Sequence, residues 1–176
     1  SSANLPLVER SMLFTQGLYG NVYDTGAQLH GNAGNLQYIV GAYNGLGEDQ
    51  NNIATRDSKA LVGRILWKAV DGLQVGGSAA KGSNGGNITN FFVNYTKNKA
   101  WLSGEYAKGD RGSGSTIVNG NGFNLNAGYH LNPKLEAVAR YDKFDETSLE
   151  NATEATLGLN YYLKSDNAKI QLNLVK

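Results

Sequence analysis

Apolar and polar side chains alternate with a period of two residues along most of this chain, from about residue 22 onward. This alternation is typical of β-strands, because successive side chains of a strand point to opposite faces of its sheet. Ten such segments occur, at residues 22–31, 35–44, 59–70, 72–81, 87–96, 99–108, 117–130, 134–142, 153–164 and 168–175. The sequence therefore predicts an all-β protein.

The segments are longer than typical strands of globular proteins, and their length matches the thickness of an outer membrane. Most have about ten residues, whereas strands of globular proteins average about five or six. Ten residues at about 3.3 Å each, tilted by about 45°, span the apolar band of an outer membrane. No stretch approaches the roughly 18 apolar residues of a membrane helix. The 23 Gly, 10 Tyr and only two Pro favour strands joined by tight turns.

The links between the segments alternate in length. Short links fall at residues 32–34, 71–72, 98, 130–133 and 165–167, and longer polar links at 45–58, 82–86, 109–116 and 143–152. Membrane barrels have short periplasmic turns and long outer loops, whereas a soluble sandwich has no reason to keep this order. We therefore predict an antiparallel up-and-down transmembrane β-barrel with its long loops outside the cell. Asp71-Gly72 predicts a type I′ turn, in which both central residues have positive φ.

Charged residues fall almost wholly on one face of the predicted sheet. In segment 59–70, Arg64 and Lys68 oppose Leu61, Ile65 and Trp67. A lysine or arginine facing lipid at mid-depth costs about 2–4 kcal/mol, so the charged face is predicted to meet water. A soluble sheet with one buried face produces the same alternation, and this alternative stays open at this point.

Several aromatic residues also lie at the same level along the predicted strands, near the short links. The outward positions near the short links hold Trp67, Tyr95, Tyr129 and Tyr161. Trp and Tyr concentrate at membrane–water interfaces, because their rings are apolar and their edges polar. These four residues therefore predict a membrane girdle, whereas an ordinary core gives no reason for this order.

Residues 1–20 differ from residues 21–176, which hold the predicted strands. They show no sustained alternation and contain Pro6. This segment is predicted to be a loop, either outside the barrel or folded into the pore, where it would constrict the passage.

Several short motifs carry a resemblance to a known family. They are Val8-Glu9-Arg10-Ser11, the hexapeptide at 26–31, the octapeptide at 38–45, Gly63-Arg64-Ile65 and the heptapeptide at 157–163. The chain resembles the phosphate-selective porin O/P family along most of its length. The resemblance implies a sixteen-stranded trimeric barrel in the outer membrane of a Gram-negative bacterium, with this chain supplying about ten later strands. Strand parity agrees, because ten strands beginning with a descending one end outside, which predicts missing strands at both ends.

The resemblance also implies basic residues along an anion path. Arg10 and Arg64 match its motifs, and Lys68, Arg140 and Lys169 face inward by register alone. The guanidinium fork of arginine can replace phosphate hydration bidentately. The alternative is that each base pairs with an inward acid, for which the candidates are Asp24, Glu105, Glu136 and Asp142.

Other classes of function find little support in the sequence. No Cys is present, and the net charge of +1 argues against a general nucleic-acid binder. His30 and His130 lie near short links, but a metal site needs more ligands. We therefore expect no enzyme, cofactor or metal. The sequence predicts an outer-membrane porin for small hydrophilic solutes, preferring phosphate-like anions, with outer-membrane lipid and copies of itself as partners. The alternatives are a non-conducting barrel that serves as anchor or adhesin, and a soluble barrel around an apolar ligand.

Overall fold

The computed structural model describes residues 5–15, 25–43, 60–82, 87–113, 116–147, 151–164 and 168–176. It has one short helix, α1 (Met12–Thr15), within these ranges. Its strands are β1 (Gly26–Ala33), β2 (Leu36–Tyr43), β3 (Ala60–Val70), β4 (Leu73–Lys81), β5 (Asn87–Lys97), β6 (Ala100–Ser113), β7 (Thr116–Asn132), β8 (Leu135–Glu146), β9 (Ala152–Tyr162) and β10 (Lys169–Val175). In this part of the chain, no helix has the length and apolar character needed to cross a membrane.

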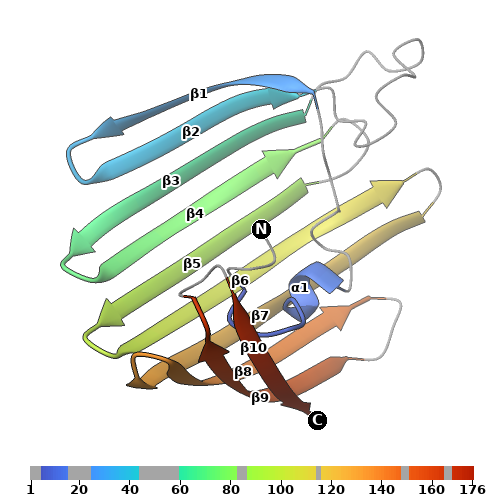
Figure 1. The fold of residues 1–176 in the computed structure, drawn as a ribbon. Coiled ribbons are helices and arrows are strands. Elements are labelled where there is room, and N and C mark those ends of the chain that lie inside the picture. Colours follow the sequence, from blue (N-terminus) through green and yellow to red (C-terminus); the bar gives the residue numbers. More distant parts are fainter. Residues whose placement is uncertain are drawn as a thin grey trace.

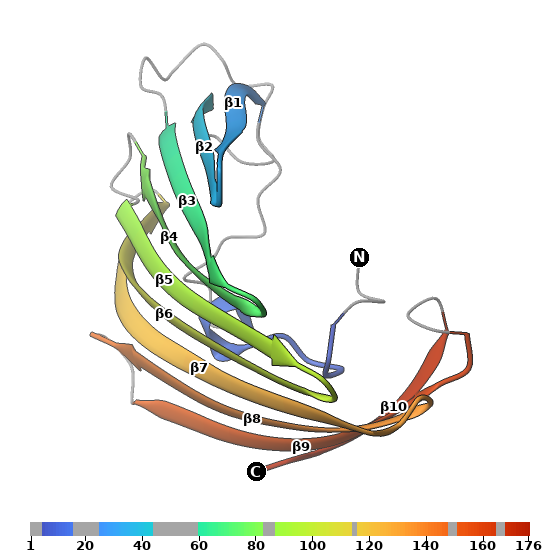
Figure 2. The same ribbon diagram turned by 90° about the vertical axis from the view of Figure 1, so that its left-hand side faces the viewer.

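The ten strands form one sheet in sequence order, and each strand is antiparallel to the next (Figure 1). The predicted all-β, antiparallel up-and-down fold is therefore confirmed. Figure 2 shows that the sheet curves strongly, with a concave and a convex face. Among the described residues no ladder joins β1 to β10, so the sheet stays open at both edges.

The two faces of the sheet differ in chemistry, as the alternation predicted. One face exposes large apolar side chains, with Leu61, Ile65, Leu125 and Leu157 each more than half accessible. The other face carries polar residues of the same strands and the N-terminal segment, residues 5–15 (Figure 2). The apolar face is therefore the outer, convex one, and within the described ranges these leucines are exposed and not packed into a closed interior.

Two links differ from their predictions. Residues 109–113 belong to β6 and pair with β7, so the glycine-rich stretch predicted as a long loop is mostly strand. β8 likewise runs to Glu146 rather than ending at residue 142. Glycine lowers strand propensity, but a complete cross-strand ladder satisfies the backbone and overrides that preference. The link 45–58 lies outside the described residues.

The turn between β3 and β4 is not of type I′. Gly72 has a φ of +75°, but Asn98 is the one non-glycine residue with positive φ in the described ranges, so Asp71 lacks it. The pairing of β3 with β4 shifts between Lys68 and Val70. This bulge supplies local twist to the hairpin, so the turn does not need positive φ at both positions.

Candidate solute path on the concave face

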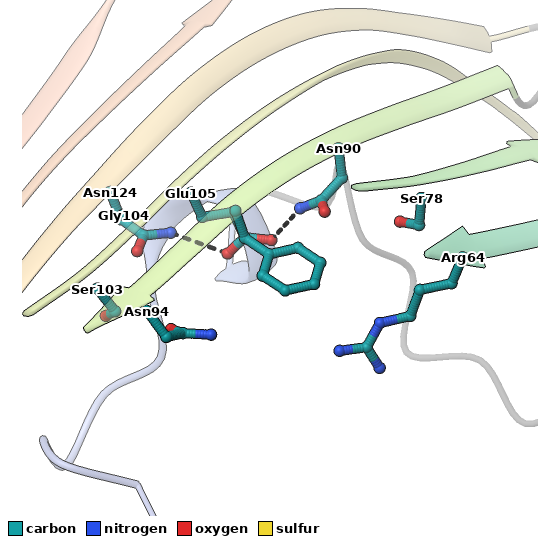
Figure 3. Close-up of a pocket in the computed structure, with 9 residues that line it drawn as sticks. Arg64, Ser78, Asn90, Asn94, Ser103, Gly104, Glu105 and Asn124 are labelled. Carbon is teal, nitrogen blue, oxygen red and sulfur yellow. Dashed lines mark hydrogen bonds between the residues drawn. The ribbon is translucent and has the colours of Figure 1, made fainter. Parts of the chain in front are cut away.

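A polar groove of about 410 Å³ crosses the concave face from β3 to β7. It is lined by amide and hydroxyl side chains together with one base, one acid and one aromatic ring, namely Arg64, Ser78, Asn90, Phe92, Asn94, Ser103, Glu105 and Asn124 (Figure 3). These residues converge because each occupies an inward position of its own strand, and neighbouring strands are in register. The groove is therefore an open surface of hydrogen-bonding groups.

The acid of this groove is held by amides. Asn90 donates to Glu105 Oε1, and Asn124 Nδ2 donates to Glu105 Oε2 at 3.1 Å (Figure 3). Asn126 Nδ2 donates in turn to Asn124 Oδ1 at 2.8 Å. Hydrogen bonds to both carboxylate oxygens fix the side chain of Glu105.

The base of the groove is more exposed. The Arg64 guanidinium carbon lies 5.1 Å from the centroid of the Phe92 ring, within the range of a cation–π contact. Lys68 is exposed on the same face, near the short-link end of β3. Across the described ranges, neither base lies within 4.0 Å of a carboxylate oxygen.

Arg140 on β8 has a different environment. Its Nε lies 2.6 Å from Asp142 Oδ2, and its Nη2 lies 2.8 Å from Glu154 Oε1. The side chains of Arg140 and Asp142 are only 4% and 0% exposed. Arg140 thus follows the alternative given above, in which an inward base forms an ion pair with a neighbouring acid.

A second buried cluster surrounds Glu136. Trp101 Nε1 donates to Glu136 Oε1 at 2.6 Å, while Tyr162 Oη and Asn160 Nδ2 donate to Oε2 at 2.6 and 2.9 Å. His130 Nε2 lies 3.5 Å from Oε1. Trp101 faces the concave side, where its indole N–H finds this partner, and the cluster joins β6, β7, β8 and β9.

The N-terminal segment binds to this part of the wall through its backbone carbonyls. Arg140 Nη1 donates to Glu9 O at 2.7 Å, and Asn160 Nδ2 donates to Pro6 O at 2.8 Å. Lys169 and Gln171 both donate to Leu5 O. These bonds satisfy carbonyls of a segment that has no strand partner of its own.

Two leucines of the segment fit over glycines of the wall. A Cβ at Gly158 would lie 2.7 Å from Leu7 Cδ2, and one at Gly122 would lie 3.0 Å from Leu13 Cδ2. Leu7 and Leu13 are 1% and 0% exposed. The segment is thus anchored by apolar packing as well as by hydrogen bonds.

The predicted site residues separate into three settings. Arg64 and Lys68 are exposed on the concave face, whereas Arg140 and Lys169 bind the N-terminal segment. Arg10 lies in that segment, with its guanidinium carbon 4.1 Å from the centroid of the Phe14 ring. Asp24 lies outside the described residues.

The predicted girdle residues all face outward at the short-link end. Trp67, Tyr129 and Tyr161 are 51%, 50% and 43% exposed. Tyr95 pairs with Leu73 and Leu102 on the same face. His30 and His130 lie on β1 and β7, six strands apart in the sheet, so they do not form a common site.

Two features of this wall were not predicted from the sequence: the packing of leucines over Gly122 and Gly158, and the cluster around Glu136. The available signal was that Gly122 and Gly158 fall at inward positions, and that Leu7 and Leu13 are apolar residues in a segment without alternation. Apolar side chains in a wet interior need a hollow that excludes water.

The comparisons with known proteins support the fold. No protein-family model and no curated protein matches the sequence. A solved structure of a porin superposes with a TM-score of 0.66 at 12% sequence identity, covering 87% of this chain and 56% of the porin chain. The chain thus spans little more than half the length of that porin, and at this identity the likeness shows the fold alone. The described strands have the fold of part of a porin barrel.

Proposed function

We propose that this chain forms part of the wall of an outer-membrane porin through which small hydrophilic solutes diffuse passively. The observation that carries the proposal is the division of one curved sheet into a convex face of exposed leucine, isoleucine and aromatic side chains and a concave face of amides and charges. Such a convex face is costly in water and favourable in lipid. The likeness to a solved porin supports the same reading.

The N-terminal segment narrows the passage in this proposal. Residues 5–15 occupy the concave side against β7–β10, and they reduce the open wall to the region of the polar groove (Figure 2). Arg10 of this segment is an exposed residue, and its guanidinium lies over the Phe14 ring. Solutes therefore pass between the segment and the groove around Arg64.

A preference for anions is the finer part of the proposal. Its support is the contrast between Arg64 and Lys68, which have no carboxylate partner among the described residues, and Glu105, which is held by two amides. The motifs around Arg10 and Arg64 resemble those of the phosphate-selective porins, and on this resemblance we propose a trimer of sixteen-stranded barrels. The long loops would face the exterior.

Planar-bilayer recording tests the proposal. The full-length protein is expected to give stepwise conductance, and a reversal potential in a chloride gradient displaced toward the anion potential. Conductance with a cation-directed reversal potential would retain the porin and remove the anion preference. A stably inserted protein without conductance would contradict the porin and favour the surface anchor instead.

A further inference from the structure

The convex face carries an apolar hollow between β3, β4 and β5. Its volume is about 870 Å³, and small residues form its floor between larger ones, namely Gly63, Gly77, Ala79, Ile65, Trp67 and Phe91. A Cβ placed at Gly63 would meet no atom within 4 Å. The convex face therefore has a groove over these small residues, whereas large side chains cover the neighbouring parts of the same face.

A polar hollow of about 480 Å³ continues this groove toward the long-link end of the sheet. Thr89 lines both hollows and so marks their junction. Lys108 on β6 pairs with Thr89 on β5 and lines the polar hollow. On the other side of β5, Lys81 on β4 pairs with Asn87. Both lysines are exposed on this face. Asp110 is the acid in the lining.

The two hollows together have the chemistry of one amphipathic ligand. The apolar part follows β4 from Val75 to Ala79, roughly 13 Å at 3.3 Å per residue step. One leaflet of a bilayer has about 15 Å of hydrocarbon, half of a core of about 30 Å. A molecule lying in both hollows would place an acyl chain over Gly63 and a charged head group beside Lys108.

We propose that these hollows bind one acylated lipid whose phosphate-bearing head group has a net negative charge. The apolar hollow holds an acyl chain, and Lys81 and Lys108 hold the phosphate. Lysines attract phosphate as mobile point charges, and the amides around Lys108 supply further donors. This proposal rests on the proposed function, because it requires the convex face to contact lipid. It adds one site with a preference for a lipid class to a face that is otherwise proposed to contact any lipid.

Fluorescence quenching by brominated lipids tests the site. A tryptophan reporter is introduced by Phe91→Trp in the full-length protein carrying Trp67→Phe, and the protein is reconstituted in nanodiscs. Trp101 is retained, because it faces the concave side and donates to Glu136. We expect mid-chain-brominated phosphatidylglycerol to quench at roughly thirtyfold lower mole fraction than brominated phosphatidylcholine, from about 1 kcal/mol for each of the two lysines near an anionic group. A matched reporter at Leu157→Trp, on the same face of β9, should show no preference.

Three variants identify the groups involved. Lys81→Gln combined with Lys108→Gln should bring the preference at position 91 to about one, and Asp110→Asn should increase it. Gly63→Leu adds a side chain to the hollow at a position where a Cβ meets no atom within 4 Å, and it should weaken quenching at 91 by both lipids.

The outcomes separate this proposal from the proposed function. Equal quenching by the two lipids at positions 91 and 157 would overturn the lipid site and leave the porin intact. No quenching at either position would overturn the contact of the convex face with lipid, and the porin with it. If Gly63→Leu changes the oligomeric state and leaves the lipid preference at 91 unchanged, the hollow belongs to a second copy and the lipid site is wrong.

Discussion

Arg64 and Arg140 lie on the same concave face, yet their surroundings differ in almost every respect. Arg140 contacts two carboxylates and a backbone carbonyl, and its side chain is 4% exposed. Arg64 is exposed beside a polar groove, with the Phe92 ring as its neighbour. The wall therefore has an anchoring region on β7–β10, where the N-terminal segment binds, and an open region on β3–β6.

The difference shows that charged residues on the concave face of this sheet can have different roles. In the anchoring region, charges and amides replace water as partners of a segment that lacks regular structure over most of its length. In the open region, the bases Arg64 and Lys68 are exposed, and among the described residues neither lies within 4.0 Å of a carboxylate oxygen. The variants below change one region at a time.

The largest effect is expected for Arg140→Leu. Removing the guanidinium leaves Asp142, which is fully buried, without its cation, and breaking a buried pair in this way costs about 3–5 kcal/mol. The matched variant Arg64→Leu should change the free energy of unfolding by about 0.5 kcal/mol or less. Urea unfolding in lipid vesicles measures both, and equal losses would remove the distinction between the two regions.

A smaller effect is expected for Gly158→Val, whose new Cβ would lie 2.7 Å from Leu7 Cδ2 and 2.8 Å from Asn173 Oδ1. Overpacking of this kind costs about 1–3 kcal/mol, and displacement of the N-terminal segment relieves it. We expect a larger single-channel conductance and faster proteolysis within residues 5–15. The double variant Gly158→Val with Leu7→Ala should return both toward the wild-type values. Unchanged conductance in the single variant would contradict the narrowing role of the segment.

The strands were predictable because their alternation is local. Nine of the ten segments begin within one residue of the observed strand, since each inward or outward choice depends only on neighbouring residues. The roles of the bases were not predictable. Arg140 binds Glu9, 131 residues away in sequence, and nothing local to either residue specifies that contact. The glycine-rich residues 109–113 were misread because local composition favoured a loop, while pairing with β7 decided the outcome.

A third prediction concerns selectivity. Arg64→Gln should lower the ratio of anion to cation permeability by roughly two- to fivefold, the range given by about 0.5–1 kcal/mol for an exposed charge interaction. Lys169→Gln is the control from the anchoring region, because Lys169 already binds Leu5 O and lies 5.9 Å from the Tyr162 ring centroid. Reversal potentials measure both variants. A larger shift in Lys169→Gln than in Arg64→Gln would place the solute path beside the segment instead of in the groove.

The smallest change is the most direct comparison of the two regions, because it alters only the salt concentration. Between about 0.1 M and 1 M salt the screening length falls from about 10 Å to about 3 Å. The permeability difference between wild type and Arg64→Gln should therefore fade, because a solute approaches Arg64 through water. The stability difference between wild type and Arg140→Leu should persist, because the Arg140–Asp142 pair is buried and only 2.6 Å apart. If both differences faded together, water would reach both arginines alike, and the N-terminal segment would not seal the anchoring region.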